Sequence, residues 1–165
     1  MAELVTIRCL SDNYAYLVQG GGQTILVDAP EAAPILKALD DKGWKATHVL
    51  ITHHHADHVQ GLDELLAKHD ASVVGHAADA DRLPKLDIAL SDGDTVTIGS
   101  DTGTVMDVSG HTVGHIAFHF PGSKVAFTAD SLMALGCGRV FEGTMPQMWE
   151  SLQKLAALPP ETTIC

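Results

Sequence analysis

The residues best suited to chemistry lie in a histidine-rich stretch, residues 52–58, with the sequence Thr-His-His-His-Ala-Asp-His. It contains four potential metal ligands, His53, His55, Asp57 and His58, between an apolar segment and a helical one. A loop can present the first two to one ion and the last two to a second. Imidazole and carboxylate ligands suit zinc, iron and manganese. The stretch therefore predicts a site for divalent metal ions, with room for two.

Two further segments offer one ligand each. His111 lies in a loop between two predicted strands, and Asp130 follows the predicted strand over residues 124–128. In layered αβ folds ligands gather at strand ends, so we expect both to join the histidine-rich loop. His111 could complete a three-histidine set with His53 and His55. Asp130 has two carboxylate oxygens and could bridge two metals, which lie about 3.5–4 Å apart in dinuclear sites.

Some histidines near these ligands have a different interpretation. His54 alternates with the ligands, so we expect it to be exposed or to support a ligand rather than to bind metal. His115 is expected to orient a ligand rather than to be one. Cys137 lies between two glycines and is interpreted as a small buried residue, as free cysteines commonly are.

The rest of the sequence predicts the elements that must position these residues. Period-two apolar patterns bounded by turn residues indicate strands, and apolar residues three and four apart indicate helices. Thr144 and Gln147 form a capping-box pattern in front of the last predicted helix. Strands are predicted over 4–9, 14–19, 23–28, 47–51, 71–75, 95–98, 103–108, 115–120 and 124–128, with a further strand beginning near 162, and helices over 31–42, near 62–66 and after 144.

Composition limits the class of protein. The chain has 165 residues, of which 45% are hydrophobic and 19% charged, which is typical of one globular domain. Its formal charge of −11 argues against nucleic acid and anionic membranes as partners. Three cysteines without pairing motifs argue against a disulfide framework. Without a signal-like or membrane-spanning apolar run, we expect a cytoplasmic protein.

The pattern His53-x-His55-x-Asp57-His58, followed by His111 and Asp130, resembles the signature of the metallo-β-lactamase superfamily. Two other stretches make the chain similar to the glyoxalase II (hydroxyacylglutathione hydrolase) family in particular. They are residues 11–14 (Ser-Asp-Asn-Tyr) and, more specifically, residues 136–144 (Gly-Cys-Gly-Arg-Val-Phe-Glu-Gly-Thr). The resemblance extends along essentially the whole chain.

The resemblance implies an α+β fold, the αββα sandwich of two mixed sheets flanked by helices. It implies two divalent ions, zinc before iron or manganese, and hydrolysis of glutathione thioesters such as S-lactoylglutathione by a metal-bound hydroxide. Asp57 and Asp130 would be the catalytic carboxylates, and Arg139 and Phe141 would contact the glutathione moiety. The metal ligands implied are His53, His55 and His111 for one ion, Asp57 and His58 for the other, and Asp130 between them.

The chain also departs from the family pattern. Phe141 stands where the family often has tyrosine, and Ala129 where it normally has glycine. The chain ends before the family's last metal-ligating histidine and its C-terminal helical domain. We therefore expect residues 1–165 to be a catalytic domain truncated at its C-terminal end, with lower occupancy of the second metal position.

Three other functions remain open. An iron-dependent persulfide dioxygenase of the same superfamily is compatible with residues 52–58. A lactamase or lactonase is possible because fold alone does not fix the substrate. An inactive fragment that binds metal is the third.

Overall fold

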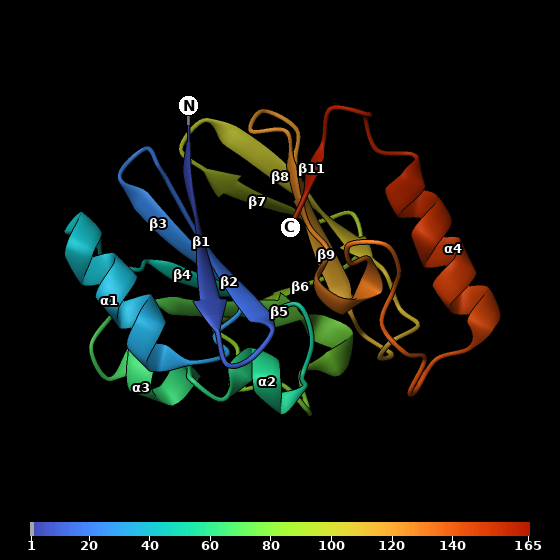
Figure 1. Ribbon diagram of the computed structural model, residues 1–165, viewed down its shortest axis with the longest axis horizontal. Helices are drawn as coiled ribbons and strands as arrows, with labels where there is room; N and C mark the ends of the chain where they lie inside the picture. Colours follow the sequence, from blue (N-terminus) through green and yellow to red (C-terminus); the bar gives the residue numbers. More distant parts are fainter. Residues whose placement is uncertain (1) are drawn as a thin grey trace.

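The computed structural model describes residues 2–165, in which two mixed β-sheets lie face to face (Figure 1). The six strands of the first sheet follow in chain order from β1 to β6. β1, β2 and β3 pair antiparallel, and β3 to β6 pair parallel. The bounds are β1 Glu3–Cys9, β2 Asn13–Gly20, β3 Gln23–Val27, β4 His48–Leu50, β5 Ser72–His76 and β6 Ile88–Leu90.

The second sheet has the order β11-β10-β9-β8-β7. Its strands pair antiparallel except for β10 and β11, which run parallel. The bounds are β7 Thr95–Ile98, β8 Asp101–Asp107, β9 Ile116–Phe120, β10 Val125–Phe127 and β11 Thr163–Ile164.

The hydrophobic core forms three layers because each sheet is apolar on both faces. Between the sheets, Val27 and Leu50 pack with Phe118 and Phe127 in one cluster. Helices α1 (Ala32–Lys42) and α3 (Leu62–Leu66) bury Ile35, Leu39 and Leu65 against the outer face of the first sheet. Helix α4 (Met145–Ala156) covers the outer face of the second sheet, where Leu155 packs on Val108 and Ala117. The expected αββα sandwich is confirmed.

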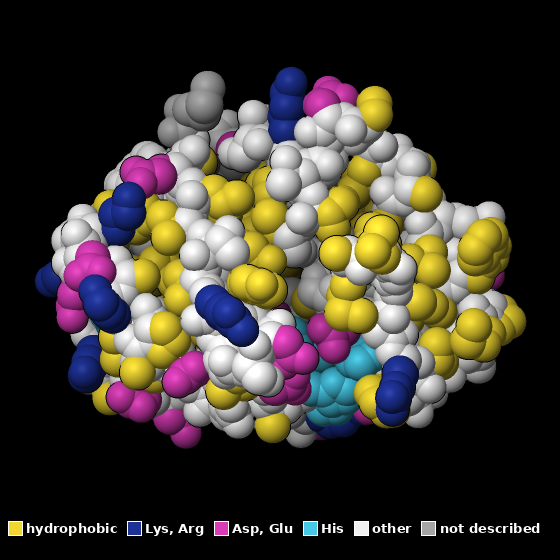
Figure 2. Space-filling view, viewed as in Figure 1, with side chains coloured by type: hydrophobic (Ala, Val, Ile, Leu, Met, Phe, Trp, Pro, Cys, Tyr) yellow, Lys and Arg dark blue, Asp and Glu magenta, His cyan; other side chains and the backbone are white. Residues whose placement is uncertain are grey.

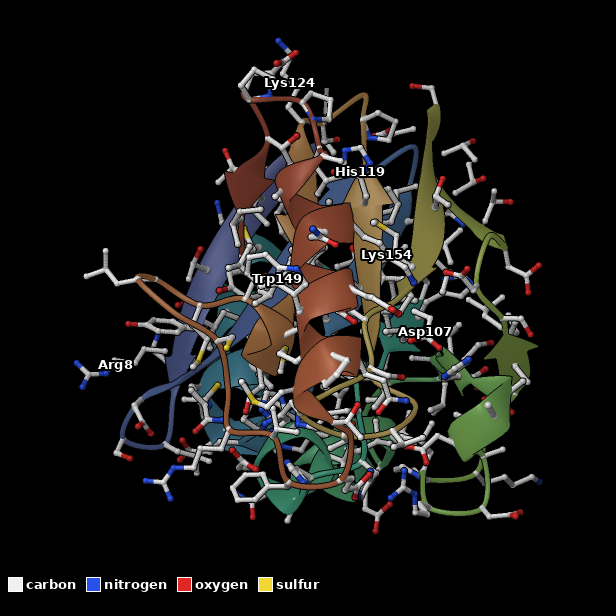
Figure 3. The ribbon with its side chains drawn as sticks, turned by 90° about the vertical axis from the view of Figure 1, so that its right-hand side faces the viewer. Arg8, Asp107, His119, Lys124, Trp149 and Lys154 are labelled. Atoms are coloured by element: carbon white, nitrogen blue, oxygen red, sulfur yellow. The ribbon has the colours of Figure 1, made fainter. Side chains whose placement is uncertain are left out.

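Helix α4 begins at the capping box that its sequence predicts. The Thr144 hydroxyl accepts from the Gln147 N–H at 3.3 Å, and the Gln147 side chain accepts from the Thr144 N–H at 2.8 Å. Lys154 reaches across to donate to the carbonyl oxygen of Asp107 at 2.8 Å, and the two residues lie side by side in Figure 3. Ser151 donates to the carbonyl oxygen of Ser109 at 2.7 Å. These contacts attach α4 to the start of the loop that carries His111.

Among the described residues, one strand and one α-helix have no counterpart among the predicted elements. Strand β6 is an apolar run of only three residues, Ile88-Ala89-Leu90, too short to predict a strand, and two of the three are exposed. Helix α2 (Ala56–Val59) begins inside the histidine-rich stretch and carries both Asp57 and His58. Within residues 2–165, no helix has both the length and the apolar character that crossing a membrane requires.

Candidate metal centre

The predicted ligands meet at one edge of the sandwich, between the two sheets. His53 and His55 lie in the loop after β4, and α2 follows them directly. His111 lies between β8 and β9, and Asp130 in the short 3₁₀ turn Ala129–Ser131 after β10. In Figure 2 the histidine side chains lie together at a hollow, with acidic side chains beside them. Three segments distant in sequence therefore build one polar site.

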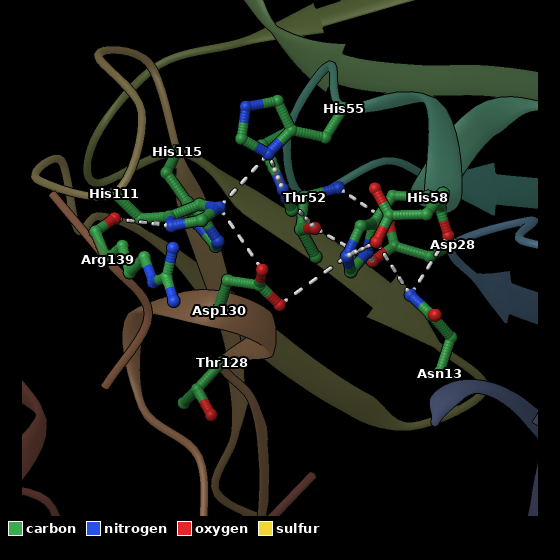
Figure 4. Close-up of polar contacts among 12 residues, drawn as sticks. Asn13, Asp28, Thr52, His55, His58, His111, His115, Thr128, Asp130 and Arg139 are labelled. Carbon is green, nitrogen blue, oxygen red and sulfur yellow. Dashed lines mark hydrogen bonds and ion pairs between the residues drawn. The ribbon is translucent and has the colours of Figure 1, made fainter. Parts of the chain in front are cut away.

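His53, His55 and His111 form the first group. One ligand atom from each lies within 4.8 Å of the others. His55 Nδ1 is 3.2 Å from His53 Nε2 and 3.0 Å from His111 Nε2 (Figure 4). Burial lowers the pKa of His53 and of His55, and neighbouring imidazoles lower both further. Neutral imidazoles with converging nitrogens are the form of histidine that binds metal.

His58 and Asp130 form a second group with His53, again with ligand atoms within 4.8 Å. His58 Nε2 lies 3.4 Å from Asp130 Oδ1 and 3.7 Å from Asp57 Oδ2. The other oxygen of Asp130, Oδ2, lies 3.1 Å from His111 Nε2. Asp130 thus faces one histidine of each group, as a bridging carboxylate would. Asp57 lies at the exposed rim, where Asn13 donates to its Oδ2 at 3.0 Å.

The protonation states of His58 and Asp130 depend on each other. Burial lowers the pKa of His58, but the carboxylates of Asp28 and Asp130 outweigh it and raise that pKa to about 10. Burial raises the pKa of Asp130, but the nearby imidazoles of His111 and His58 hold it well below its usual range. Without a cation, His58 and Asp130 therefore form an ion pair at neutral pH. A metal ion on His58 must displace that proton.

Asp28 orients His58 and is a candidate site residue that the sequence analysis did not assign. Its side chain is buried; Oδ1 accepts from the Thr52 N–H at 2.8 Å, and Oδ2 accepts from the Thr52 hydroxyl at 2.8 Å. Oδ2 also accepts from His58 Nδ1 at 2.7 Å, which turns Nε2 toward Asp130. Asp28 follows an apolar strand, as the histidine-rich loop does. This shared position is the signal by which the sequence could have indicated Asp28.

The loop over residues 136–144 supports the other side of the site. Its Arg139 carbonyl oxygen accepts from His111 Nδ1 at 2.7 Å, which leaves His111 Nε2 free to bind. The Gly138 N–H donates to the carbonyl oxygen of Asp130 at 2.7 Å. A Cβ on Gly138 would lie 2.5 Å from that oxygen and 2.7 Å from His111 Nδ1, so this backbone approach requires glycine. Ala129 has a φ of 41°, a left-handed conformation that glycine adopts more readily.

The predicted substrate contacts lie on the same loop. Arg139 and Phe141 are exposed, and the Phe141 ring is 5.3 Å from the His111 ring and 5.9 Å from the His55 ring. The expectation that Cys137 is buried is wrong, because its side chain is exposed. Gly136 and Gly138 let the chain turn there without burying the cysteine.

His115 and His54 make different contacts beside the candidate ligands. His115 is buried and stacks on His53 with 4.5 Å between ring centroids; burial, aided by the charges of His111 and His58, lowers its pKa to about 3. His54 is partly buried and contacts Asp79 and Glu142 at 3.2 Å and 3.3 Å. On the His58 side, a cleft of about 420 Å³ opens between the sheets and is lined partly by Tyr14.

The donors present fit divalent metal ions. His58 Nε2 is buried without a hydrogen-bond partner among the described residues, which is costly unless a ligand satisfies it. The nitrogen and oxygen donors suit zinc, iron or manganese alike. The site therefore favours binding of divalent cations and does not by itself select one.

A protein-family model described as "Metallo-beta-lactamase superfamily" matches residues 10–165. Among curated proteins, a hydroxyacylglutathione hydrolase of Cereibacter sphaeroides is 63% identical over 99% of this chain and 65% of its own length. A hydroxyacylglutathione hydrolase of Ruegeria pomeroyi is 61% identical, with the same two coverages. The chain therefore spans about two thirds of the length of these relatives.

Solved structures share the fold. The crystal structure of TTHA1623 in a di-iron-bound form is 29% identical, with a TM-score of 0.83 over 98% of this chain and 89% of that one. ETHE1 from Myxococcus xanthus is also 29% identical, with a TM-score of 0.83 over 99% of this chain and 73% of that one. The B3 metallo-β-lactamase BLEG-1 has a TM-score of 0.88 at 21% identity, over 98% of this chain and 90% of its own.

Proposed function

The chain belongs to the metallo-β-lactamase superfamily, and from that premise we propose that it hydrolyses glutathione thioesters such as S-lactoylglutathione at a two-metal centre. The observation that carries the proposal is the 63% identity, along 99% of the chain, to a hydroxyacylglutathione hydrolase. The loop over residues 136–144, which carries the glutathione-contact pattern, lies directly against His111. Its position supports a substrate that reaches from the metal centre toward this loop.

We assign His53, His55 and His111 to one ion, and Asp57 and His58 to the other, with Asp130 between them. The converging groups His53–His55–His111 and His53–His58–Asp130 and the unpartnered Nε2 of His58 support the assignment of these five residues. Asp57 belongs to neither group and lies 3.7 Å from His58 Nε2. A related protein of 29% identity has been solved with two iron ions, which supports a centre for two metals in this fold. We propose zinc as the metal, with iron or manganese as alternatives.

When bound, two divalent ions act as Lewis acids that polarise a carbonyl group and lower the pKa of water. Asp130 would hold the two metal positions at a fixed separation. Asp57, at the exposed rim and oriented by Asn13, is placed to accept a proton from the attacking water. A glutathione thiol has a pKa of about 8.5, typical of cysteine, so the thiolate can leave without a separate acid.

We assign binding of the glutathione moiety to the exposed loop over residues 136–144. Glutathione thioesters are anionic, as this chain is, so a local cation must offset the overall repulsion. Arg139 is exposed on the loop that borders the centre and can provide that charge. Phe141 packs near both His55 and His111 and can cover an apolar part of the ligand, but it has no hydroxyl to donate.

The proposal is tested by loading the 165-residue chain with zinc and following the loss of thioester absorbance of S-lactoylglutathione. We expect turnover that is lost in Asp130→Ala and retained in Asp101→Ala. Asp101 is a matched control, because its carboxylate accepts backbone N–H groups in a turn outside the site. Oxygen consumption with glutathione persulfide and an iron-loaded sample would instead identify a dioxygenase. Metal bound without either reaction would identify a binding fragment.

A further inference from the structure

Arg82 follows the 3₁₀ turn Ala77–Asp79, and its guanidinium makes three contacts, one to that turn and two to distant segments. Nε donates to Asp79 Oδ1 at 2.5 Å, and Nη1 donates to Glu142 Oε1 at 2.7 Å. Nη2 donates to the carbonyl oxygen of Val113. The planar fork of arginine can satisfy three acceptors at once, whereas a lysine ammonium acts as a point charge.

The partners of Arg82 are joined to each other and to the ligand loops. Glu142 Oε2 accepts from the Val113 N–H at 2.9 Å, so Val113 is held at both its N–H and its carbonyl oxygen. His54 contacts Asp79 through Nδ1 and Glu142 through Nε2. His54 lies between the candidate ligands His53 and His55 in the histidine-rich loop. The cluster of Arg82, Asp79, Glu142 and His54 therefore touches that loop, the loop that carries His111, and the loop over residues 136–144, which we call the substrate loop.

The cluster is partly shielded from water. The Asp79 side chain is 2% exposed, that of Glu142 27% and that of Arg82 40%. Gly114 lies against Asp79, where an added Cβ would come within 2.8 Å of the Asp79 Cβ, so the loops are closely packed there. Hydrogen bonds between charged groups are shorter and stronger than neutral ones, and stronger still when partly screened from water.

The position of the substrate loop depends on these contacts. Phe141 donates from its N–H to the carbonyl oxygen of His111 at 3.2 Å, a long bond at the edge of the loop. Gly143 donates to the carbonyl oxygen of Gly110 at 3.1 Å. Glu142 lies between these two residues and is the one whose side chain is anchored by charge. Loss of the ion pair between Arg82 and Glu142 would make the segment that carries Phe141 more mobile, while the two sheets would keep their structure.

We propose that Arg82 is a positioning residue that fixes the substrate loop, residues 136–144, against the two ligand loops, and so determines how tightly the glutathione moiety binds. It touches neither the candidate ligands nor the cleft; it acts through Glu142 and Val113. The assignment of the glutathione moiety rests on the proposed function, whereas the fixing of the loop does not.

The loop is tested without any substrate, by amide hydrogen exchange measured by NMR on the metal-free chain. In Arg82→Ala we expect the Val113, Phe141 and Gly143 amides to exchange faster by on the order of tenfold, the factor that losing one charged hydrogen bond makes in an equilibrium. Amides of the β1–β2 pair are expected to keep their rates. Arg82→Lys keeps the charge without the fork, and we expect it to resemble the alanine variant.

The matched control is Lys37→Ala, which removes an exposed ion pair with Asp41 on helix α1. We expect it to leave the exchange of residues 110–143 and the kinetics unchanged. Equal acceleration of the β1–β2 amides in Arg82→Ala would show a purely global stabilising role and would overturn the proposal. Unchanged exchange at Val113 and Phe141 would overturn it as well.

The substrate part is tested by kinetics of the zinc-loaded variants. With S-lactoylglutathione we expect Arg82→Ala to raise KM by roughly tenfold and to change kcat far less, because binding is loosened while the ligands remain. A fall in kcat at constant KM would contradict the role in binding. If the wild-type chain does not hydrolyse the thioester, the proposed function fails, and the exchange experiment still decides the positioning role of Arg82.

Discussion

Replacing Asp28 by asparagine changes one atom of the site and should weaken one of the two metal positions selectively. Asp28 has a φ of 56°, a left-handed conformation that asparagine also tolerates, so the backbone remains unstrained. The Thr52 N–H already donates to Oδ1, which fixes the amide oxygen of the new residue there. The amide nitrogen must then take the place of Oδ2, opposite His58 Nδ1 at 2.7 Å.

This orientation reverses the tautomer of His58. The amide nitrogen is a donor, so Nδ1 must accept and the proton moves to Nε2, the atom that faces Asp130. Substitution of such outer partners costs about 10- to 100-fold in metal affinity, or about 1.4–2.8 kcal/mol. We expect a loss of this size at the His58 position. The His53, His55 and His111 group has no direct contact with Asp28 and is linked to it only through the Thr52 hydroxyl, which lies 3.1 Å from His53 Nδ1, so its affinity should change far less.

The assay is competition for zinc with chelators of graded affinity, which resolves two binding steps. Asp87→Asn is the matched control, because Asp87 Oδ2 accepts from the Val73 N–H at 2.8 Å far from the ligands. We expect Asp87→Asn to lower the free energy of unfolding and to leave the affinities of both zinc-binding steps unchanged. Equal weakening of both zinc-binding steps by Asp28→Asn would refute the reasoning. A substitution that weakens neither step would also refute it.

Three further changes have defined outcomes. Gly138→Ala places a Cβ against His111 and the Asp130 carbonyl, so we expect weaker zinc binding in the same competition assay; unchanged binding would contradict the close approach. Thr144→Ala removes the cap of helix α4 and should lower the free energy of unfolding in urea by about 1 kcal/mol. The pKa of His115 is about 3 in the folded chain and about 6.5 unfolded. The unfolded chain therefore binds more protons below pH 6.5, and we expect the metal-free protein to lose stability progressively toward pH 3, whereas a flat pH profile would contradict a buried neutral His115.

The sequence predicted the ligands because metal chemistry requires particular residue types at short spacing. His53, His55 and His58 were assigned from seven residues, and the folded chain brings them together with His111 and Asp130. Their assignment to metal ions stays a prediction. The pattern of strands and helices was compatible with the observed fold, but the fold class itself was inferred from the resemblance of the metal-binding motif and of residues 136–144 to a known family. Strand β6 was missed because its register depends on pairing with β5 and not on its own pattern.

The supporting residues could not be found in this way. Asp28 acts on His58 from 30 positions away, and Arg82 meets Glu142 from 60 positions away. No local spacing encodes such pairs, and a lone carboxylate or arginine resembles any surface residue. His54 shows the same limit: its neighbours predicted a spacer, whereas its contacts with Asp79 and Glu142 come from the fold. Contacts of this kind, between residues far apart in sequence, orient the candidate ligands and set their charges, and residue identity alone does not reveal them.

The most direct test of the central claim is the rate of S-lactoylglutathione hydrolysis measured as zinc is titrated into the metal-free 165-residue chain. We predict that the rate rises to a plateau at about two zinc ions per chain, as expected of a two-metal hydrolytic centre. A chain that binds two zinc ions and leaves the thioester intact would contradict the proposed function. A plateau at one ion would contradict the two-metal assignment of His58 and Asp130.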